Sequence, residues 1–232
     1  MAQKLKTIGF DADDTLWHNE RFFKLTQDRF EDLLSDYTDK SLLHDRLVAA
    51  ERRNIGHYGF GVKGFVLSMI ETAIDVTDGA VPGHVIQQLL DAGQDMLAHP
   101  IELLPHVQHT VETLSSTHRL VLITKGDLLH QERKLAQSGL GELFDDVSIV
   151  SDKSVTTYQT VFAPLQGGIE GAMMVGNSMK SDVVPAVQAG SWGVFVPHDL
   201  VWDLEKADPP DSPRFHAIEN LGALPDLVAE IG

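Results

Sequence analysis

The sequence has no cysteine among its 232 residues, and this absence excludes several kinds of site. Disulfide bridges, thiolate nucleophiles and zinc sites built on cysteine all require that residue. Any covalent catalysis must therefore use a different side chain. A chain without cysteine also suits a reducing compartment, and we expect a cytoplasmic protein.

Basic residues are scarce: 18 Lys and Arg stand against 34 Asp and Glu, which gives a formal net charge of -16. A field of that sign repels nucleic acid and anionic membrane surfaces, so we expect neither as a partner. An anionic substrate would need a local positive site, a metal ion or backbone N–H groups aimed at it.

Long apolar runs are missing too. No stretch approaches the roughly 18 consecutive apolar residues of a membrane span, and the start of the chain has no signal-peptide pattern. The composition, 43% hydrophobic and 22% charged, is ordinary for a globular chain that buries a core. A length of 232 residues suits one domain, or a core domain that carries an insert.

Short apolar runs of strand length alternate with helical patterns in most of the chain. Such alternation predicts parallel βαβ units, and continuously apolar runs fit a sheet that is covered on both faces. We therefore predict an α/β fold with a doubly wound, Rossmann-like parallel sheet. The predicted strands are 5–10, 120–123, 147–150, 172–175 and 192–196, and the predicted helices are 107–114, 128–137, 158–165, 181–189 and 218–231.

Residues 17–99 differ from the rest because they contain no strand pattern. Their periodic segments are helical, and glycines such as Gly56, Gly59, Gly61 and Gly64 are interpreted as breaks between helices. This stretch predicts an inserted helical domain at 17–99, with the α/β core formed by 1–16 and 100–232.

Polar residues follow four of the predicted strands at the point where each strand ends. Ligands of a doubly wound sheet bind beyond the carboxyl ends of its strands, so we expect these residues to share one crevice. In chain order, the groups are Asp11 with Asp13; Thr124, Lys125 and Gly126; Lys153; and Asn177 with Asp182.

The residue types in this set suit attack on a negatively charged electrophile. Asp11 is the candidate nucleophile, since a carboxylate can form a covalent intermediate. Asp13 is the candidate general acid and base; its pKa must be raised for this role, while Asp11 stays ionised. Mg2+ commonly joins one or two carboxylates to substrate phosphate. Thr124 and backbone N–H groups would bind phosphoryl oxygens, and Lys153 would neutralise charge, with Lys125 as its competitor.

The same residues carry a resemblance to a known family. The segment Phe10-Asp-Ala-Asp-Asp-Thr-Leu16 resembles the DxDxT loop of the haloacid dehalogenase-like hydrolase superfamily. Thr124 and Lys153 resemble its second and third motifs, and the segment from Gly176 to Asp182 resembles its fourth motif, GDxxxxD. The four motifs stand in family order, so the resemblance covers essentially the whole chain.

The resemblance implies a Mg2+-dependent phosphatase that acts on a small phosphorylated metabolite. Asp11 would form an aspartyl-phosphate, Asp13 would be the acid and base, and the second and third motifs would bind phosphate. The inserted domain would be the family's helical cap. The metal would be held by the Asp11 carboxylate, the Asp13 backbone carbonyl and the fourth-motif residues Asn177 and Asp182.

One departure from the family pattern keeps alternatives open. Asn177 stands where the family has an acidic residue, and an amide supplies an oxygen ligand but no charge. A catalytically impaired phosphate-binding protein is therefore an alternative, as are a phosphomutase and a 2-haloacid dehalogenase. The presence of Asp13 favours phosphoryl transfer, because a departing halide needs no proton. His18 either faces the active site or fills the linker to the inserted domain. The sequence does not specify the phosphomonoester or the oligomeric state.

Overall fold

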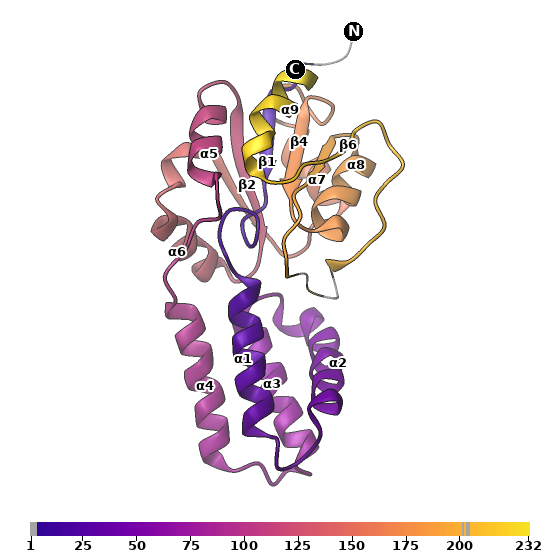
Figure 1. The fold of residues 1–232 in the computed structure, drawn as a ribbon. Helices are drawn as coiled ribbons and strands as arrows, with labels where there is room; N and C mark the ends of the chain where they lie inside the picture. The colour runs from indigo at the N-terminus through magenta and orange to yellow at the C-terminus, as the bar shows by residue number, and fades with distance from the viewer. Residues whose placement is uncertain (1–3, 201, 203–204) are drawn as a thin grey trace. The chain divides into compact units, whose positions relative to one another are not determined.

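The structure is a computed structural model, and it describes residues 4–200, 202 and 205–232 (Figure 1). Its strands are β1 (Thr7–Phe10), β2 (Arg119–Lys125), β3 (Asp146–Val150), β4 (Ala172–Gly176), β5 (Trp192–Phe195) and β6 (Phe215–Ala217). Its α-helices are α1 (Glu20–Leu33), α2 (Lys40–Tyr58), α3 (Val62–Val76), α4 (Gly83–Ala98), α5 (Val107–Ser115), α6 (Leu128–Ser138), α7 (Val155–Phe162), α8 (Val184–Ala189) and α9 (Leu224–Ile231).

The strands form one parallel sheet in the order β3-β2-β1-β4-β5-β6. At the centre, Phe10 of β1 is in register with Leu122 of β2 on one side and with Val175 of β4 on the other. The strand order reverses at β1, which is the topological switch point of a doubly wound sheet. The predicted fold class is confirmed.

Strand β6 is absent from the sequence-based prediction. It is only three residues long and follows a proline-rich segment, so it carries too little periodicity to be recognised. The predicted helix at 218–231 is also too long, because a 3-10 turn occupies Leu221–Ala223 and the α-helix begins at Leu224. Pro225 suits this start, since the first helical turn does not need its N–H.

Both faces of the sheet are buried, because successive strand residues alternate between two hydrophobic clusters. Leu120 and Leu122 of β2 belong to one cluster, which includes residues of α5 and α9, while Val121 and Ile123 belong to the other, which includes residues of α7 and α8. Helices on both faces explain why the strands have continuously apolar sequences.

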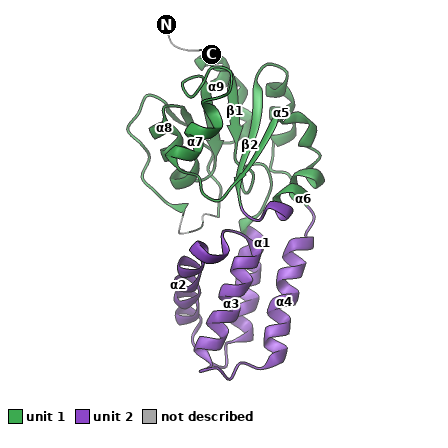
Figure 2. Cartoon of the chain, turned by 180° about the vertical axis from the view of Figure 1, so that it is seen from behind, with its two compact units in different colours: residues 1–20, 101–125, 131–232 green, residues 21–100, 126–130 purple. Residues whose placement is uncertain are grey.

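The chain divides into two compact units, one of residues 1–20, 101–125 and 131–232 and the other of residues 21–100 and 126–130 (Figure 2). The sequence places the boundaries near these points, at 16/17 and 99/100, but assigns 126–130 to the core. The helical unit has its own hydrophobic core, which includes Phe30, Leu47 and Met69.

Two of the glycines interpreted as helix breaks are inside helices. Gly56 lies in α2 and Gly64 in α3, so the turn between these helices is only Gly59 to Gly61. Gly59 and Gly61 have positive φ angles of 73° and 115°, a backbone region that favours glycine. Gly59 and Gly61 therefore form the break because their backbone is in this region. A glycine with helical backbone angles, such as Gly56 or Gly64, does not end a helix.

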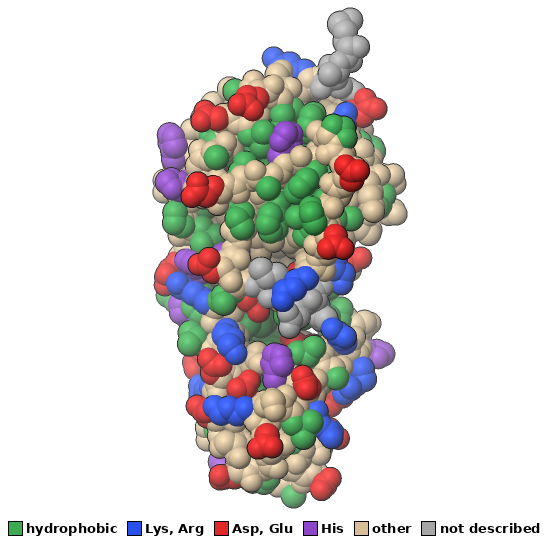
Figure 3. All heavy atoms as spheres, turned by 45° about the vertical axis from the view of Figure 1, so that its right-hand side comes forward, with side chains coloured by type: hydrophobic (Ala, Val, Ile, Leu, Met, Phe, Trp, Pro, Cys, Tyr) green, Lys and Arg blue, Asp and Glu red, His purple; other side chains and the backbone are tan. Residues whose placement is uncertain are grey.

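Charged side chains of both signs lie side by side on the face drawn in Figure 3. Among the described residues, no helix combines the length and apolar character that crossing a membrane requires.

Candidate active site

Asp11 lies at the carboxyl end of β1, beside the switch point of the sheet. Its backbone N–H donates to Val175 O of β4 at 2.9 Å, so the strand pairing continues up to this residue. Its side chain is buried, and Oδ2 accepts a hydrogen bond from Thr15 Oγ1 at 3.0 Å. The sheet and the loop that follows β1 thus hold the carboxylate in one orientation.

Lys153 connects two of the predicted motifs through its ammonium group. The Nζ atom donates to Asp11 Oδ1 and, at 2.7 Å, to Asp182 Oδ1, and all three side chains are buried. The second oxygen of Asp182 accepts the backbone N–H of Ser178 at 2.9 Å. Asp182 therefore holds Lys153 in the structure, and its metal-binding role stays a prediction.

Gly176 makes room for Asp182 at the end of β4. A Cβ atom at position 176 would lie 2.2 Å from Asp182 Oδ2, a distance that no side chain tolerates. Asp182 is on a π-helical turn, Met179–Val183, which precedes α8. Such turns are rare and frequently found at functional sites. The glycine of the fourth motif is thus explained by close packing.

The pKa of Asp11 is raised from its usual value to about 7. Burial is the largest cause, because it disfavours the charged form, and the nearby Asp182 acts in the same direction. Lys153 opposes both. The pKa of Lys153 is raised, because the two carboxylates outweigh the effect of its burial. One ammonium thus balances two carboxylates only in part.

Three side chains hold the Asp13 carboxylate through hydrogen bonds. Oδ1 accepts from Lys134 Nζ at 2.8 Å and from Trp17 Nε1 at 2.7 Å, and Oδ2 accepts from Gln131 Nε2 at 3.0 Å. The side chain keeps 23% exposure, against 9% for Asp11, so Asp13 is the more accessible of the two carboxylates.

The expected directions of the two pKa shifts are wrong for the substrate-free protein. Burial tends to raise the pKa of Asp13, but the charge of Lys134 and the hydrogen bonds from Lys134, Gln131 and Trp17 outweigh it and lower that pKa. Asp11 has the raised pKa instead, because its one cation is shared with Asp182. Neither cause is visible in the spacing of the motif.

Gln131 and Lys134 are functional candidates that the sequence reasoning missed. Both are buried on α6, one turn apart, on the same face as the buried Leu135. The sequence does carry a signal for them, because both are polar residues at positions where the amphipathic pattern of this helix predicts apolar, buried side chains. Gln131 Nε2 also lies 2.9 Å from Thr124 Oγ1, while its Oε1 has no hydrogen-bond partner among the described residues.

The predicted phosphate-binding residues after β2 have partners of their own. Thr124 is buried and bonded to Gln131. Lys125 Nζ donates to Glu205 Oε1 at 2.7 Å and to Ser181 Oγ at 2.8 Å. Gly126 has a φ of 132° and belongs to the compact unit of the helices. Glu205 was missed because its loop carries no periodic pattern, and no signal in the sequence links it to Lys125.

The donor set around Asn177 fits a hard cation such as Mg2+. One end of its amide lies 3.2 Å from the Asp13 carbonyl oxygen, from Asp11 Oδ2 and from Thr15 Oγ1. With the NH2 group at this end, its two N–H donors can bond to two of these oxygens when no cation is present. With the amide turned, carbonyl, carboxylate and amide oxygens face one another, at separations close to the roughly 2.9 Å between neighbouring ligands in an octahedron of Mg–O bonds. Asp11, Asp13 and Asn177 are therefore chemically suited to hold the ion.

Replacing Lys134 should destabilise the protein through Asp13. In Lys134→Met, the partly buried carboxylate loses its cation, and we expect a loss of about 1–3 kcal/mol in the free energy of unfolding at pH 7. The lowered pKa of Asp13 contributes stability above the unfolded pKa, near 4, and this contribution disappears as the pH falls through the folded pKa. The loss should therefore shrink below pH 4. Urea unfolding at pH 7 and pH 3.5 measures it, with Lys180→Met as a surface control; an equal loss at both values would refute the electrostatic cause.

Removing the charge of Asp11 should stabilise the metal-free protein. The folded pKa of about 7 lies above the unfolded value, so Asp11 favours the folded state fully below about pH 4, and that contribution is lost as the pH rises through 7. With EDTA present, Asp11→Asn should melt at least about 3 °C above the unmodified protein at pH 8 and close to it at pH 4.5. Circular dichroism melting measures the difference, and the exposed Asp208→Asn is the control. A gain that does not depend on pH would contradict this reading.

Comparisons with known proteins agree on one family. The family model described as haloacid dehalogenase-like hydrolase matches residues 5–190. A haloacid dehalogenase-like family hydrolase from Xanthomonas campestris is 38% identical in its crystal structure, with a TM-score of 0.89, over 99% of this chain and 92% of that one. A curated relative from Methanothermobacter thermautotrophicus, called glyceraldehyde 3-phosphate phosphatase, is 26% identical over 84% of this chain and 87% of its own length.

More distant structures share the fold. A putative hydrolase of the same family from Bacillus subtilis, described as bound to magnesium, is 16% identical over 97% of this chain and 99% of that one, with a TM-score of 0.68. The L-2-haloacid dehalogenase of Xanthobacter autotrophicus is 17% identical over 98% of this chain and 100% of that one, also with a TM-score of 0.68. The family match, the fold and the four motifs at the strand ends lead to one conclusion: the chain belongs to the haloacid dehalogenase-like hydrolases.

Proposed function

We propose that the protein hydrolyses a small phosphomonoester through an aspartyl-phosphate on Asp11, with Mg2+ as cofactor. The observation that carries this proposal is the position of the Asp11 carboxylate. One of its oxygens is bonded to Lys153, and the other lies 3.2 Å from the Asn177 amide end that also faces the Asp13 carbonyl. An anionic carboxylate that attacks an anionic phosphate needs positive charge beside it, because the two negative groups repel each other.

The first step is the attack of an Asp11 oxygen on phosphorus. A bond from carboxylate oxygen to phosphorus forms, and the bond between phosphorus and the ester oxygen breaks. Asp13 supplies a proton to the departing alkoxide and becomes a carboxylate. Its pKa is lowered in the free protein, and a phosphate group beside it would raise that pKa, since a second negative charge disfavours ionisation.

The second step returns the enzyme to its starting state. Asp13, now a carboxylate, accepts a proton from water while the water oxygen attacks phosphorus. The bond between phosphorus and Asp11 breaks, and inorganic phosphate leaves. Lys134, Gln131 and Trp17 fix the Asp13 carboxylate for both transfers, which is the requirement for a general acid and base.

The fit of the Asn177 site supports Mg2+ as the cofactor. Asp11, the Asp13 carbonyl and Asn177 would hold the ion. When bound, Mg2+ would offset the charges of the carboxylate and of the phosphoryl oxygens. The neutral amide supplies less charge than a carboxylate would, so Lys153 remains important for neutralising Asp11.

The relative called glyceraldehyde 3-phosphate phosphatase supports a small phosphorylated metabolite as substrate. We propose this class without choosing its member, and we assign Thr124 and the backbone that follows it, through Lys125 and Gly126, to phosphate binding. Such a reaction on a soluble metabolite suits the cytoplasm, which the absence of cysteine favours. We further propose that the helical unit is the cap that selects the substrate.

The proposal is tested by phosphate release from an aryl phosphate and from a panel that includes glyceraldehyde 3-phosphate, with Mg2+ or with EDTA. Asp11→Asn should lower the rate at least about a thousandfold, and Asp13→Asn by about 10² to 10⁴, while the exposed Asp208→Asn leaves it unchanged. Chelation should abolish release. Activity that survives in Asp11→Asn would overturn the mechanism. Metal-independent halide release from a 2-haloacid that tolerates Asp13→Asn would identify a dehalogenase instead.

A further inference from the structure

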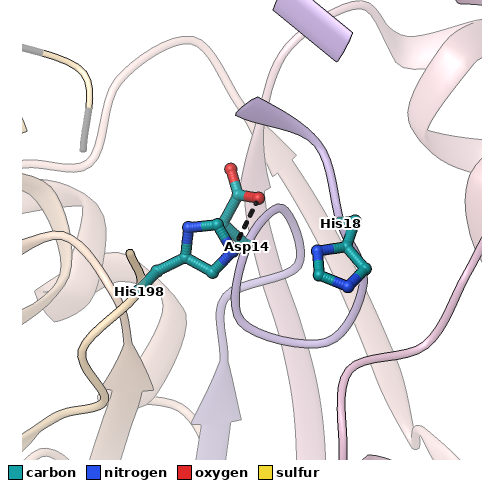
Figure 4. A group of neighbouring side chains, drawn as sticks. All are labelled: Asp14, His18 and His198. Carbon is teal, nitrogen blue, oxygen red and sulfur yellow. Dashed lines mark ion pairs between the residues drawn. The ribbon is translucent and has the colours of Figure 1, made fainter. Parts of the chain in front are cut away.

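A second group of potential metal ligands lies outside the set that surrounds Asn177. Asp14 and His18 come from the loop after β1, and His198 comes from the segment after β5 (Figure 4). One ligand atom from each residue lies within 4.8 Å of the other two. Two parts of the chain that are distant in sequence thus bring metal-binding atoms close together.

The His198 ring is oriented as a metal-ligating histidine would be. Its Nδ1 lies 3.0 Å from the Leu200 carbonyl oxygen and 3.3 Å from the Leu200 backbone nitrogen, so Leu200 contacts this nitrogen in either tautomer of the ring. The other ring nitrogen, Nε2, faces Asp14 Oδ1 at 3.5 Å. A metal-bound histidine usually donates its other ring N–H to a carbonyl or carboxylate, and the Leu200 carbonyl is in place to accept that bond from Nδ1 when Nε2 binds a metal.

Asp14 is held in place before any ion binds. Its backbone has a φ of 60°, in the left-handed region, and its carboxylate accepts the backbone N–H groups of Asn19 and Glu20 at 2.8–3.1 Å. The carboxylate is 7% exposed and retains lone pairs beyond those bonds. Asp14 therefore loses little conformational entropy when it binds an ion, because the fold already holds it in place.

We infer that Asp14, His18 and His198 bind a divalent transition-metal ion of the zinc type. Zn–N and Zn–O bonds of about 2.0–2.2 Å place neighbouring ligand atoms of a tetrahedron roughly 3.4 Å apart. The 3.5 Å between His198 Nε2 and Asp14 Oδ1 is too long for a good hydrogen bond but matches that edge. Three protein ligands leave a fourth position for water.

The two metal sites differ in ligand chemistry. Imidazole nitrogen selects zinc, copper or nickel over magnesium, whereas the oxygen set of Asp11, Asp13 and Asn177 selects a hard ion. The zinc-type ion would join the loop that carries Asp13 to the segment after β5. Because Asp14 directly follows Asp13, this ion would restrain the loop of the nucleophile without being part of the proposed reaction.

The test is a titration of untagged, metal-free protein with Co2+ and with Zn2+ in excess Mg2+, so that the oxygen site is filled. We expect one tight equivalent, and an intense visible absorption of tetrahedral Co2+. His18→Gln and His198→Gln should each weaken binding about tenfold or more and reduce that absorption. The exposed His109→Gln is the matched control, and circular dichroism shows whether each variant is folded.

Two results would overturn the inference. One is the absence of a tight equivalent when Mg2+ is saturating, which would mean that Zn2+ binds only at the oxygen site. The other is binding that the His18 and His198 variants retain, which would assign it to other histidines. Neither result depends on phosphatase activity, so this inference and the proposed function fail separately.

Discussion

The structure of the site depends on one buried ammonium, that of Lys153, between the carboxylates of Asp11 and Asp182. Two carboxylates cannot share a buried space without such a cation, because burial and mutual repulsion both disfavour their charged forms. Lys153 follows β3, Asp11 follows β1 and Asp182 follows β4, so the interaction also brings three strand ends together. Lys153 lowers the pKa of Asp11 but does not offset burial and the charge of Asp182, and a further cation beside Asn177 would act in the same direction as Lys153.

The parts of the fold that follow from local pattern could be predicted. The five longer strands have continuous apolar runs, and the parallel order then places Asp11, Thr124, Lys153 and Asn177 at one edge. Strand β6 could not be predicted because three residues carry no period. At Gly56 the sequence predicts a helix break that does not exist, because a glycine inside a helix cannot be told from a break without the tertiary contacts of α2.

The sequence motifs point to the strand ends where Asp11, Lys153 and Asp182 meet, but not to the electrostatics of the candidate site. The motif identifies Asp11 and Asp13, yet their pKa directions depend on which cations lie nearby, and these come from distant segments. Lys134 is 121 residues from Asp13, and Glu205 is 80 residues from Lys125. Sequence spacing contains no information on such pairs, and only the fold brings them together.

Most of the proposed site residues lie in one of the two compact units, whereas Gly126 belongs to the other. Asp11, Asp13, Lys153, Asn177 and Asp182 all belong to the α/β unit, and the helical unit has a core of its own. Residues inside the helical unit can therefore be substituted without disturbing these carboxylates. This separation agrees with the proposal that the helical unit selects the substrate.

The central claim is that the Asp11 carboxylate becomes covalently bonded to phosphorus, and mass spectrometry of rapidly acid-quenched enzyme measures this directly. After brief mixing with a turned-over phosphomonoester and Mg2+, the peptide that contains Asp11 should gain the mass of one phosphoryl group. Reduction of the acyl phosphate with borohydride should mark position 11, and Asp11→Asn should show neither change. Steady phosphate release with an unmodified Asp11 peptide, or a phosphoryl group on another residue, would contradict the account.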